Sequence, residues 1–178
     1  MVIISDYTLS SISDTLILVE SKCESFCPQC GMQLTYRDSR KRIKKEEGGN
    51  NRFLIIRRLR CDQCHRLHNE LPDCVVPHKH YSTDVISGVL DEVIHPDDAE
   101  CEMYPCETTM NRWKHWMMAN QDFINRCLAC RNPLISEITQ NCQEQKKTVF
   151  SKIREKYRNW LEMILRIIYN SGRSLNSF

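Results

Sequence analysis

The chain of 178 residues is 41% hydrophobic and 27% charged with a net charge of +2, an ordinary globular composition that excludes wholesale disorder. Its eleven cysteines are an odd number, which excludes a complete set of internal disulfides. No stretch approaches the roughly 18 consecutive apolar residues of a membrane span, and the start MVIISDYTLSSISD lacks the features of a secretory signal, so a reducing cytoplasm is expected.

The N-terminal part of the chain has the pattern of strands and loops. Residues 1–22 are predicted to be a lead-in segment that packs on the next part of the chain. Within residues 23–75, the runs QLTYR and RFLIIRRL have strand character, and the polar stretch between them contains the turn signal GGNN. Two strands joined by a polar turn predict a β-hairpin.

Two pairs of cysteines with CxxC spacing flank this hairpin, Cys27 with Cys30 and Cys61 with Cys64. Each CxxC turn can direct two thiolates to one tetrahedral ion at about 2.3 Å, and Gly31 permits the tight turn after the first pair. The pattern predicts a zinc ribbon with one Zn²⁺ per chain held by these four cysteines. A redox motif is disfavoured because it needs a strand-to-helix junction, and unliganded thiols beside so many arginines would be prone to oxidation.

Other cysteines and histidines offer further ligands. His65 and His68 flank the second pair, and we expect them at the surface or outside the coordination shell, because four cysteines already fill the site. In the helical part, a second zinc site is one interpretation, and burial as small apolar side chains is the preferred one, for Cys101, Cys106, Cys127 and Cys130.

Beyond the hairpin the pattern changes to helices. Residues 76–81 are a predicted linker, and residues 82–120 a predicted helix-turn-helix made of a helix over 82–94, a short helix from Pro96 and a helix over 107–119.

The C-terminal region, residues 121–178, is also predicted to be helical. A helix over 121–142 is interrupted near Pro133, and a long amphipathic helix covers 144–170 with one apolar side. We expect this last helix to pack on the rest of the domain or to pair with a second copy in a homodimer.

Charge is distributed unevenly along the chain. Residues 37–66 hold eleven Lys and Arg against four Asp and Glu, whereas residues 84–107 hold eight acids and no Lys or Arg. A dense basic surface suits a phosphate backbone, and a merely solvated hairpin is the alternative. The residues predicted to contact DNA from the hairpin are Arg40, Lys41, Arg42, Lys44 and Lys45.

The predicted helix over 107–119 carries side chains of the types that reach base edges and phosphates. If Met110, Trp113 and Met117 pack inward, polar and basic residues line the outer edge. An ordinary polar helix face is the alternative, and the acids that precede the helix must point away from DNA. The residues predicted to contact DNA from this helix are Thr108, Thr109, Asn111, Arg112, Lys114 and His115.

Four segments carry a resemblance to a known family: CPQCG, RRLRCDQCHRLHNELPD, VPHKHYS and PCETTMNRWKHW. Together they resemble small bacterial zinc-ribbon and helix-turn-helix proteins of unknown function, and the N-terminal DNA-binding region of insertion-sequence transposases, over about residues 24–120. The resemblance implies ligand roles for the four paired cysteines and a recognition-helix role for Thr108–His115. Cys106 stands where the pattern expects a serine N-cap.

The expected fold is α+β, with an N-terminal four-cysteine zinc ribbon built on a β-hairpin, an all-helical helix-turn-helix region and a long C-terminal amphipathic helix. The expected function is that of a non-enzymatic, zinc-dependent protein that binds double-stranded DNA, as a regulator or accessory factor of a mobile element. No catalytic residue is assigned, because only 58 residues follow Asn120 and they lack the strand pattern of a transposase catalytic domain. The alternatives are a zinc ribbon that docks on a protein partner and a transposase-derived remnant with residual nuclease activity.

Overall fold

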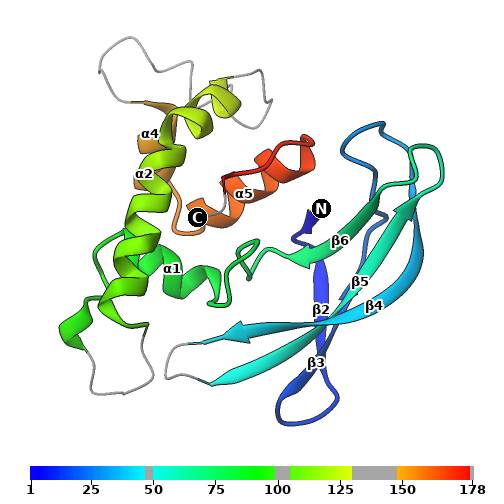
Figure 1. Ribbon diagram of the computed structural model, residues 1–178, viewed down its shortest axis with the longest axis horizontal. Helices are drawn as coiled ribbons and strands as arrows, with labels where there is room; N and C mark the ends of the chain where they lie inside the picture. The colour runs from blue at the N-terminus through cyan, green and yellow to red at the C-terminus, as the bar shows by residue number, and fades with distance from the viewer. Residues whose placement is uncertain (47–49, 99–104, 130–147, 177–178) are drawn as a thin grey trace.

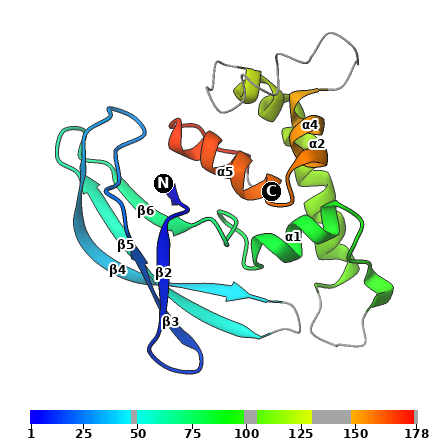
Figure 2. The same cartoon turned by 180° about the vertical axis from the view of Figure 1, so that it is seen from behind.

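The computed structural model describes residues 1–46, 50–98, 105–129 and 148–176, and it consists of a strand-rich layer beside a helical layer (Figure 1, Figure 2). All strands of the described residues lie before residue 73, and all their α-helices lie after residue 82. The last helix lies between the sheet and the other helices. None of the described helices is long and apolar enough to cross a membrane.

The sheet is mixed and curls into a half-barrel (Figure 1). Its order is β1-β6-β5-β3-β2, and β4 pairs with β5 as well. The β1–β6 and β3–β5 pairs are parallel, and the others are antiparallel. The strands are β1 (Val2–Ile4), β2 (Tyr7–Ser11), β3 (Leu16–Ser21), β4 (Leu34–Lys45), β5 (Asn51–Cys61) and β6 (Leu67–Pro72).

The predicted fold class, a zinc-ribbon hairpin followed by an all-helical region, is wrong. The expected hairpin is present as β4 and β5, but it is one part of a six-stranded sheet that also includes strands from the first 21 residues. Two parallel pairings join distant segments: Val2–Ile4 lies beside Glu70–Pro72, and Leu16–Leu18 lies beside Phe53–Ile55. Parallel pairs need long connections, so no local turn signal marks them in the sequence.

The central strand β5 changes its buried side partway along. Leu54 and Ile56 are buried in alternation, but the next buried position is Leu59. Near this change, the register of β4 shifts between Tyr36 and Asp38. A bulge leaves one residue unpaired and increases the local twist of the pair. The buried positions of RFLIIRRL accordingly do not keep the strict alternation of a strand with one buried face.

The helices of the described residues are α1 (Thr83–Leu90), the short 3₁₀ helix η2 (Pro96–Asp98), α2 (Glu107–Ala129), α4 (Val149–Lys156) and α5 (Trp160–Asn170). α1 ends four residues before the predicted position. Glu92 has a φ of 58°, and the N–H groups of Val93 and Ile94 return to the carbonyl of Gly88 at 2.9 and 3.1 Å. This turn ends the helix because it uses a carbonyl of the last turn that is otherwise without a partner.

The later helices also differ from the predicted ranges. α2 continues without a break past 119, and the rest of the predicted helix 121–142 lies outside the described residues. The predicted helix over 144–170 is two helices, because Tyr157 is extended, with φ −121° and ψ 125°. The break changes the direction of the chain, and the apolar residues of α4 and α5 pack into one core with those of α1 and α2. The apolar side of the C-terminal helices thus packs on the rest of the chain; a homodimer stays a prediction.

The two layers have separate cores that meet at β1. Ile3 belongs to the helical core, whereas Val2 and Ile4 belong to the sheet core, because successive side chains of a strand point to opposite faces. At the end of α5, the side chain of Asn170 accepts a hydrogen bond from the Ile3 N–H and donates one to the Ile3 carbonyl, both at 2.8 Å. β1 and α5 therefore connect the sheet to the helices.

Candidate metal centre

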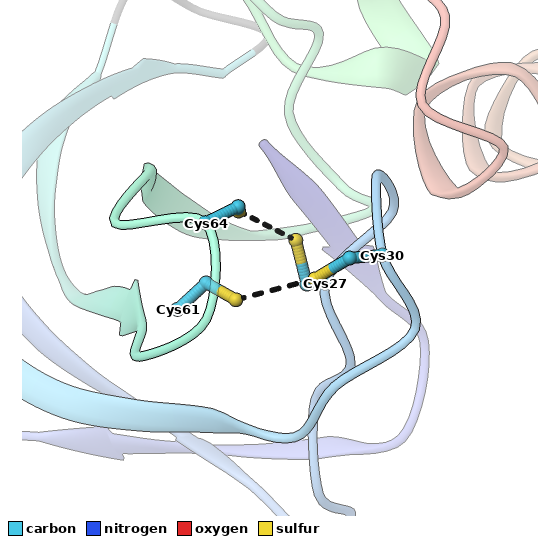
Figure 3. Close-up of side chains that lie close together, drawn as sticks. All are labelled: Cys27, Cys30, Cys61 and Cys64. Atoms are coloured by element: carbon cyan, nitrogen blue, oxygen red, sulfur yellow. Dashed lines mark hydrogen bonds between the residues drawn. The ribbon is translucent and has the colours of Figure 1, made fainter.

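The first knuckle, residues 27–31, lies in the loop between β3 and β4. The Gly31 N–H donates to the Cys27 carbonyl at 2.8 Å, and the Cys27 N–H donates to the Met32 carbonyl at 2.7 Å. Gly31 has a φ of 76°, which glycine adopts without steric cost. This closed turn holds Cys27 and Cys30 so that both side chains reach the same site (Figure 3).

The second knuckle, residues 61–65, starts at the last residue of β5. The Cys61 N–H donates to the Arg66 carbonyl at 3.0 Å, a bond that spans five residues as in the first knuckle. His65 has a φ of 57° and takes the place that Gly31 has in the first knuckle. The left-handed conformation costs a residue with a side chain about 1 kcal/mol or more, so the surrounding contacts must hold it.

The four cysteine sulfurs face one another across the two knuckles (Figure 3). The Sγ of Cys27 is 3.6 Å from that of Cys64, and the Sγ of Cys30 is 3.4 Å from that of Cys61. All four sulfurs lie within 4.8 Å of one another. Around a tetrahedral ion with bonds of about 2.3 Å, sulfurs lie about 3.8 Å apart. The prediction that these four cysteines come together is confirmed, and the cluster can hold a metal ion.

The thiols of this cluster alter one another's protonation. The backbone N–H of Cys64 is the main group that lowers the pKa of Cys61 to about 7. At Cys30 the Met32 N–H favours the thiolate, but hydrogen bonding to Cys61, burial and the other thiols raise the pKa to about 12. Sulfurs this close cannot all lose their protons unless a cation compensates their charge. The cluster is therefore suited to a cation.

A buried histidine of β6 contacts one of the four cysteines. The Nε2 of His68 lies 3.5 Å from the Sγ of Cys27, and its Nδ1 lies 2.9 Å from the amino group of Met1. Burial is the main cause that lowers the pKa of this imidazole, followed by the charges of the chain's amino group and Arg66. His68 is not one of the four residues whose donor atoms cluster, so it touches a ligand and is not itself in the set. His65 is exposed.

A buried carboxylate, which the sequence analysis did not single out, anchors the first knuckle to the sheet. Glu70 is 2% exposed, and it accepts hydrogen bonds from the Ser25 hydroxyl at 2.6 Å and from two nitrogens of Arg57 at 2.6 and 2.8 Å. A buried charge is stable only when it is paired in this way. The one sequence signal for this buried carboxylate is the presence of a glutamate inside the strand-like run LHNELP.

Of the four cysteines of the alternative second metal site, the two that the structure describes lie far apart. Cys106 is exposed immediately before α2, and Cys127 is buried near its end. About 30 Å of helix separates them, so they cannot share an ion. Cys101 and Cys130 lie outside the described residues. The burial of Cys127 agrees with its interpretation as a small apolar core residue.

The basic residues of β4 are only partly available to a ligand. Arg42 donates to two backbone carbonyls of the segment that follows β6, and Lys44 forms an ion pair of 3.0 Å with a glutamate at the end of the strand. Lys45 lies against an aromatic ring. Arg40 and Lys41 are exposed. Of the five residues predicted to contact DNA from this strand, three are therefore engaged within the chain.

α2 buries the side that the sequence predicts. Met110, Trp113 and Met117 are all buried. Lys114 lies 3.8 Å from the carboxylate of Glu92, so one of the preceding acids pairs with this helix and does not project alone from the surface. Among the residues predicted to contact DNA, Thr109 and Lys114 are half-buried and the exposed ones are Thr108, Asn111, Arg112 and His115.

The end of β4 lies beside the start of α2. The Nζ of Lys45 is 5.3 Å from the centre of the Tyr81 ring, and this ring packs edge-on against Trp113 with 5.0 Å between the ring centres. The Lys45 N–H also donates to the His80 carbonyl at 2.8 Å. The two segments that the sequence analysis predicts to contact DNA therefore both contact Tyr81, a residue that the sequence places only in a linker.

Comparison with known protein families finds one match. Residues 27–113 match a domain of unknown function, DUF6431. The match begins at the first cysteine of the first knuckle and ends at Trp113 of α2, so it includes both knuckles and the contact between β4 and α2. No curated protein and no solved structure matches the chain.

Proposed function

We propose that the chain binds one Zn²⁺ at Cys27, Cys30, Cys61 and Cys64. Four thiolates at tetrahedral spacing are a donor set typical of zinc, and the sulfur separations suit a single ion. An iron–sulfur cluster would hold the cysteine sulfurs farther apart, because iron and sulfide ions lie between them.

The donor set also supports a structural role for this ion. Zinc with four protein ligands has no open position for water or substrate, whereas catalytic zinc sites keep one position open. The chain is therefore proposed to be non-enzymatic, and residual nuclease activity at this centre is disfavoured. The first knuckle precedes β4, and the second knuckle lies between β5 and β6. The ion would therefore connect three strands of the sheet.

The contact chain Lys45–Tyr81–Trp113 is the observation that supports duplex DNA as the partner. It sets the end of the basic strand β4 beside the start of α2. We propose that one duplex contacts both segments. Arg40 and Lys41 are suited to phosphates, because exposed basic side chains gain affinity by counterion release. Asn111 and Arg112 are suited to base edges, to adenine and guanine respectively. The resemblance to transposase DNA-binding regions supports the same partner, and with it a role as regulator or accessory factor of a mobile element.

One observation favours docking on a protein as the second candidate function. Phe26 and Met32, which flank the first knuckle, are 55% and 51% exposed. Large apolar side chains beside a rigid metal centre can serve as anchors in a protein interface. Binding to a protein would then use the knuckle surface and would not require the α2 edge.

Binding to duplex DNA across a salt series separates the two candidates. We expect log affinity to fall linearly with log salt concentration, Arg40→Ala to weaken all duplexes similarly, and Arg112→Ala to relax sequence preference at a cost of about 1–3 kcal/mol. The matched control is Arg126→Ala, because Arg126 is exposed on the same helix about 20 Å from Arg112. If no duplex binds with salt-dependent affinity, protein docking takes the place of DNA binding.

Metal analysis of the purified protein tests the zinc assignment. The expected result is one zinc per chain in the wild type and none retained in Cys61→Ser. A wild type that contains iron in place of zinc, or a Cys61→Ser variant that keeps its zinc, would contradict the assignment.

A further inference from the structure

The contact between His68 and Cys27 is separate from the four-cysteine set and has a defined geometry. His68 is 4% exposed, so its ring nitrogens depend on partners within the protein. Both nitrogens have one: Nε2 faces the Sγ of Cys27 at 3.5 Å, and Nδ1 faces the Met1 amino group at 2.9 Å. A distance of 3.5 Å is within the usual range of an N–H···S hydrogen bond, because sulfur is larger than oxygen.

The partner at Nδ1 decides where the proton of the imidazole lies. A protonated amino group can only donate, so Nδ1 accepts from it, and the neutral ring then carries its proton on Nε2. An imidazolium would carry a proton on Nε2 as well. In either protonation state the group that points at Cys27 is therefore an N–H donor, and a thiolate is its natural acceptor.

The first knuckle is held against this donor by a second residue on the same side of β6. Glu70 follows His68 by two positions, and side chains two apart in a strand share a face. The Glu70 carboxylate holds the Ser25 hydroxyl at 2.6 Å, two residues before Cys27. Arg57 fixes the carboxylate in turn with two hydrogen bonds. Cys27 thus has little freedom to move away from His68.

We propose that His68 is a positioning residue of the metal centre, whose Nε2–H donates a hydrogen bond to the Cys27 thiolate and thereby strengthens metal binding. The proposal rests on metal binding by the four cysteines. The hydrogen bond withdraws charge from one of four crowded thiolates and fixes the rotamer of Cys27. Partners of this kind around a metal ligand typically contribute about 10–100-fold to metal affinity. The other three cysteines have no such imidazole within hydrogen-bonding distance in the described part of the chain.

Variants at position 68 distinguish the effect of the His68 hydrogen bond on metal binding from the effect of the volume of its side chain. His68→Leu keeps an apolar volume without a donor, and His68→Gln restores an N–H. Competition with a chelator should show about 10–100-fold weaker zinc binding for His68→Leu, and recovery of most of this loss for His68→Gln. The matched control is His80→Gln, because His80 is exposed and away from the knuckles; it should bind zinc as the wild type does.

Cobalt in place of zinc provides a readout that a purely structural role would not change. The sulfur-to-cobalt charge-transfer band should move to lower energy in His68→Leu, because a thiolate without the hydrogen bond is more electron-rich. The ligand-field bands should keep the pattern of four sulfurs in every variant. Equal affinity and an unchanged band in His68→Leu would overturn the inference, and so would a wild-type spectrum of three sulfurs and one nitrogen, which would make His68 a ligand.

A measurement on the wild type covers the case in which His68→Leu does not fold. Nitrogen NMR of the zinc-loaded protein should show the His68 ring protonated at Nε2. A ring protonated only at Nδ1 cannot donate to Cys27 and would reject the inference. Failure of the wild type to bind zinc or cobalt at all is a different result, because it removes the metal centre itself.

Discussion

The sheet core and the helical core are stabilised in different ways. Among the described residues, the sheet core has twelve buried residues, mostly aliphatic and without an aromatic side chain, and two of them are Cys27 and Cys61 of the candidate metal centre. The helical core of the same described residues has 22 buried residues and includes all three tryptophans. A small aliphatic core buries little area per residue, so the proposed ion would add stability that packing alone does not supply. We expect the helices, in contrast, to stay folded without metal, because their core is larger.

The two regions are nevertheless connected beside the metal centre. The side chain of Gln29 in the first knuckle donates to the Gly172 carbonyl at 2.9 Å, just after α5. Gly172 has a φ of 78°, and a Cβ there would lie 2.6 Å from the Pro28 carbonyl oxygen. Only glycine lets the C-terminal turn approach the knuckle this closely. The turn that follows α5 therefore contacts the first knuckle directly.

The largest expected effect is that of metal removal. Chelation should expose β4, β5, β6 and both knuckles to hydrogen exchange, because removal of the ion breaks the link between the two knuckles and the sheet core is small. α1 and α2 should stay protected. Hydrogen exchange followed by mass spectrometry measures this region by region. If the sheet stays protected from exchange without metal, the expected difference between a metal-dependent sheet core and a metal-independent helical core is wrong.

Substitution in the helical core should lower the stability of the protein and leave the metal centre unchanged. Trp160 is 1% exposed, packs edge-on against Phe150, and donates from its indole nitrogen to Asp91 at 2.8 Å. Trp160→Ala should lower the free energy of unfolding by about 3–5 kcal/mol. Zinc affinity should remain that of the wild type, because Trp160 lies at the opposite end of α5 from the contact between Gly172 and the first knuckle. Denaturant titration and chelator competition on the same variant provide both values, and a parallel loss of zinc affinity would contradict independent cores.

The hydrogen bonds between Asn170 and Ile3, which connect the layers, should contribute less to the free energy of unfolding than either core does. Asn170→Ala removes both side-chain hydrogen bonds to the backbone of Ile3 and leaves buried groups without partners. We expect a loss of about 2 kcal/mol in the free energy of unfolding. Asn69→Ala, on β6, is the control. Loss of protection confined to β1 and α5 in hydrogen exchange would confirm that this contact couples the layers; an unchanged stability would show that water replaces it.

The smallest expected effect is a pH dependence at the boundary between the layers. Burial, with added repulsion from Asp84 and Asp73, raises the pKa of Glu162 on α5 from 4.5 to about 7. Between these values the folded state binds more protons than the unfolded state, so stability falls as pH rises through this window. The change should be about 1–2 kcal/mol, reduced by partial solvent exposure. Chemical denaturation across the window should show this slope in the wild type and a flatter one in Glu162→Gln, and equal slopes would assign the effect to other groups.

Several features can be derived from the sequence because they depend on residues close together in the chain. The CxxC spacing predicts two knuckles, and their four sulfurs do lie together. The polar turn between two strand-like runs predicts the β4–β5 hairpin, and the spacing of Met110, Trp113 and Met117 predicts the buried side of α2. In each case the geometry of a turn or of a helix decides which neighbours meet.

Other features exist only in the tertiary structure. The parallel pairing of residues 2–4 with 70–72 has no local signal, because its stability comes from segments far apart that meet only after folding. For the same reason the sequence predicts a separate ribbon where the chain forms a six-stranded sheet. The burial of Glu70 with Arg57, and the contact of Lys45 with Tyr81 and Trp113, likewise depend on distant partners. Local spacing therefore determines the ligands of the metal centre, whereas long-range packing decides what surrounds it.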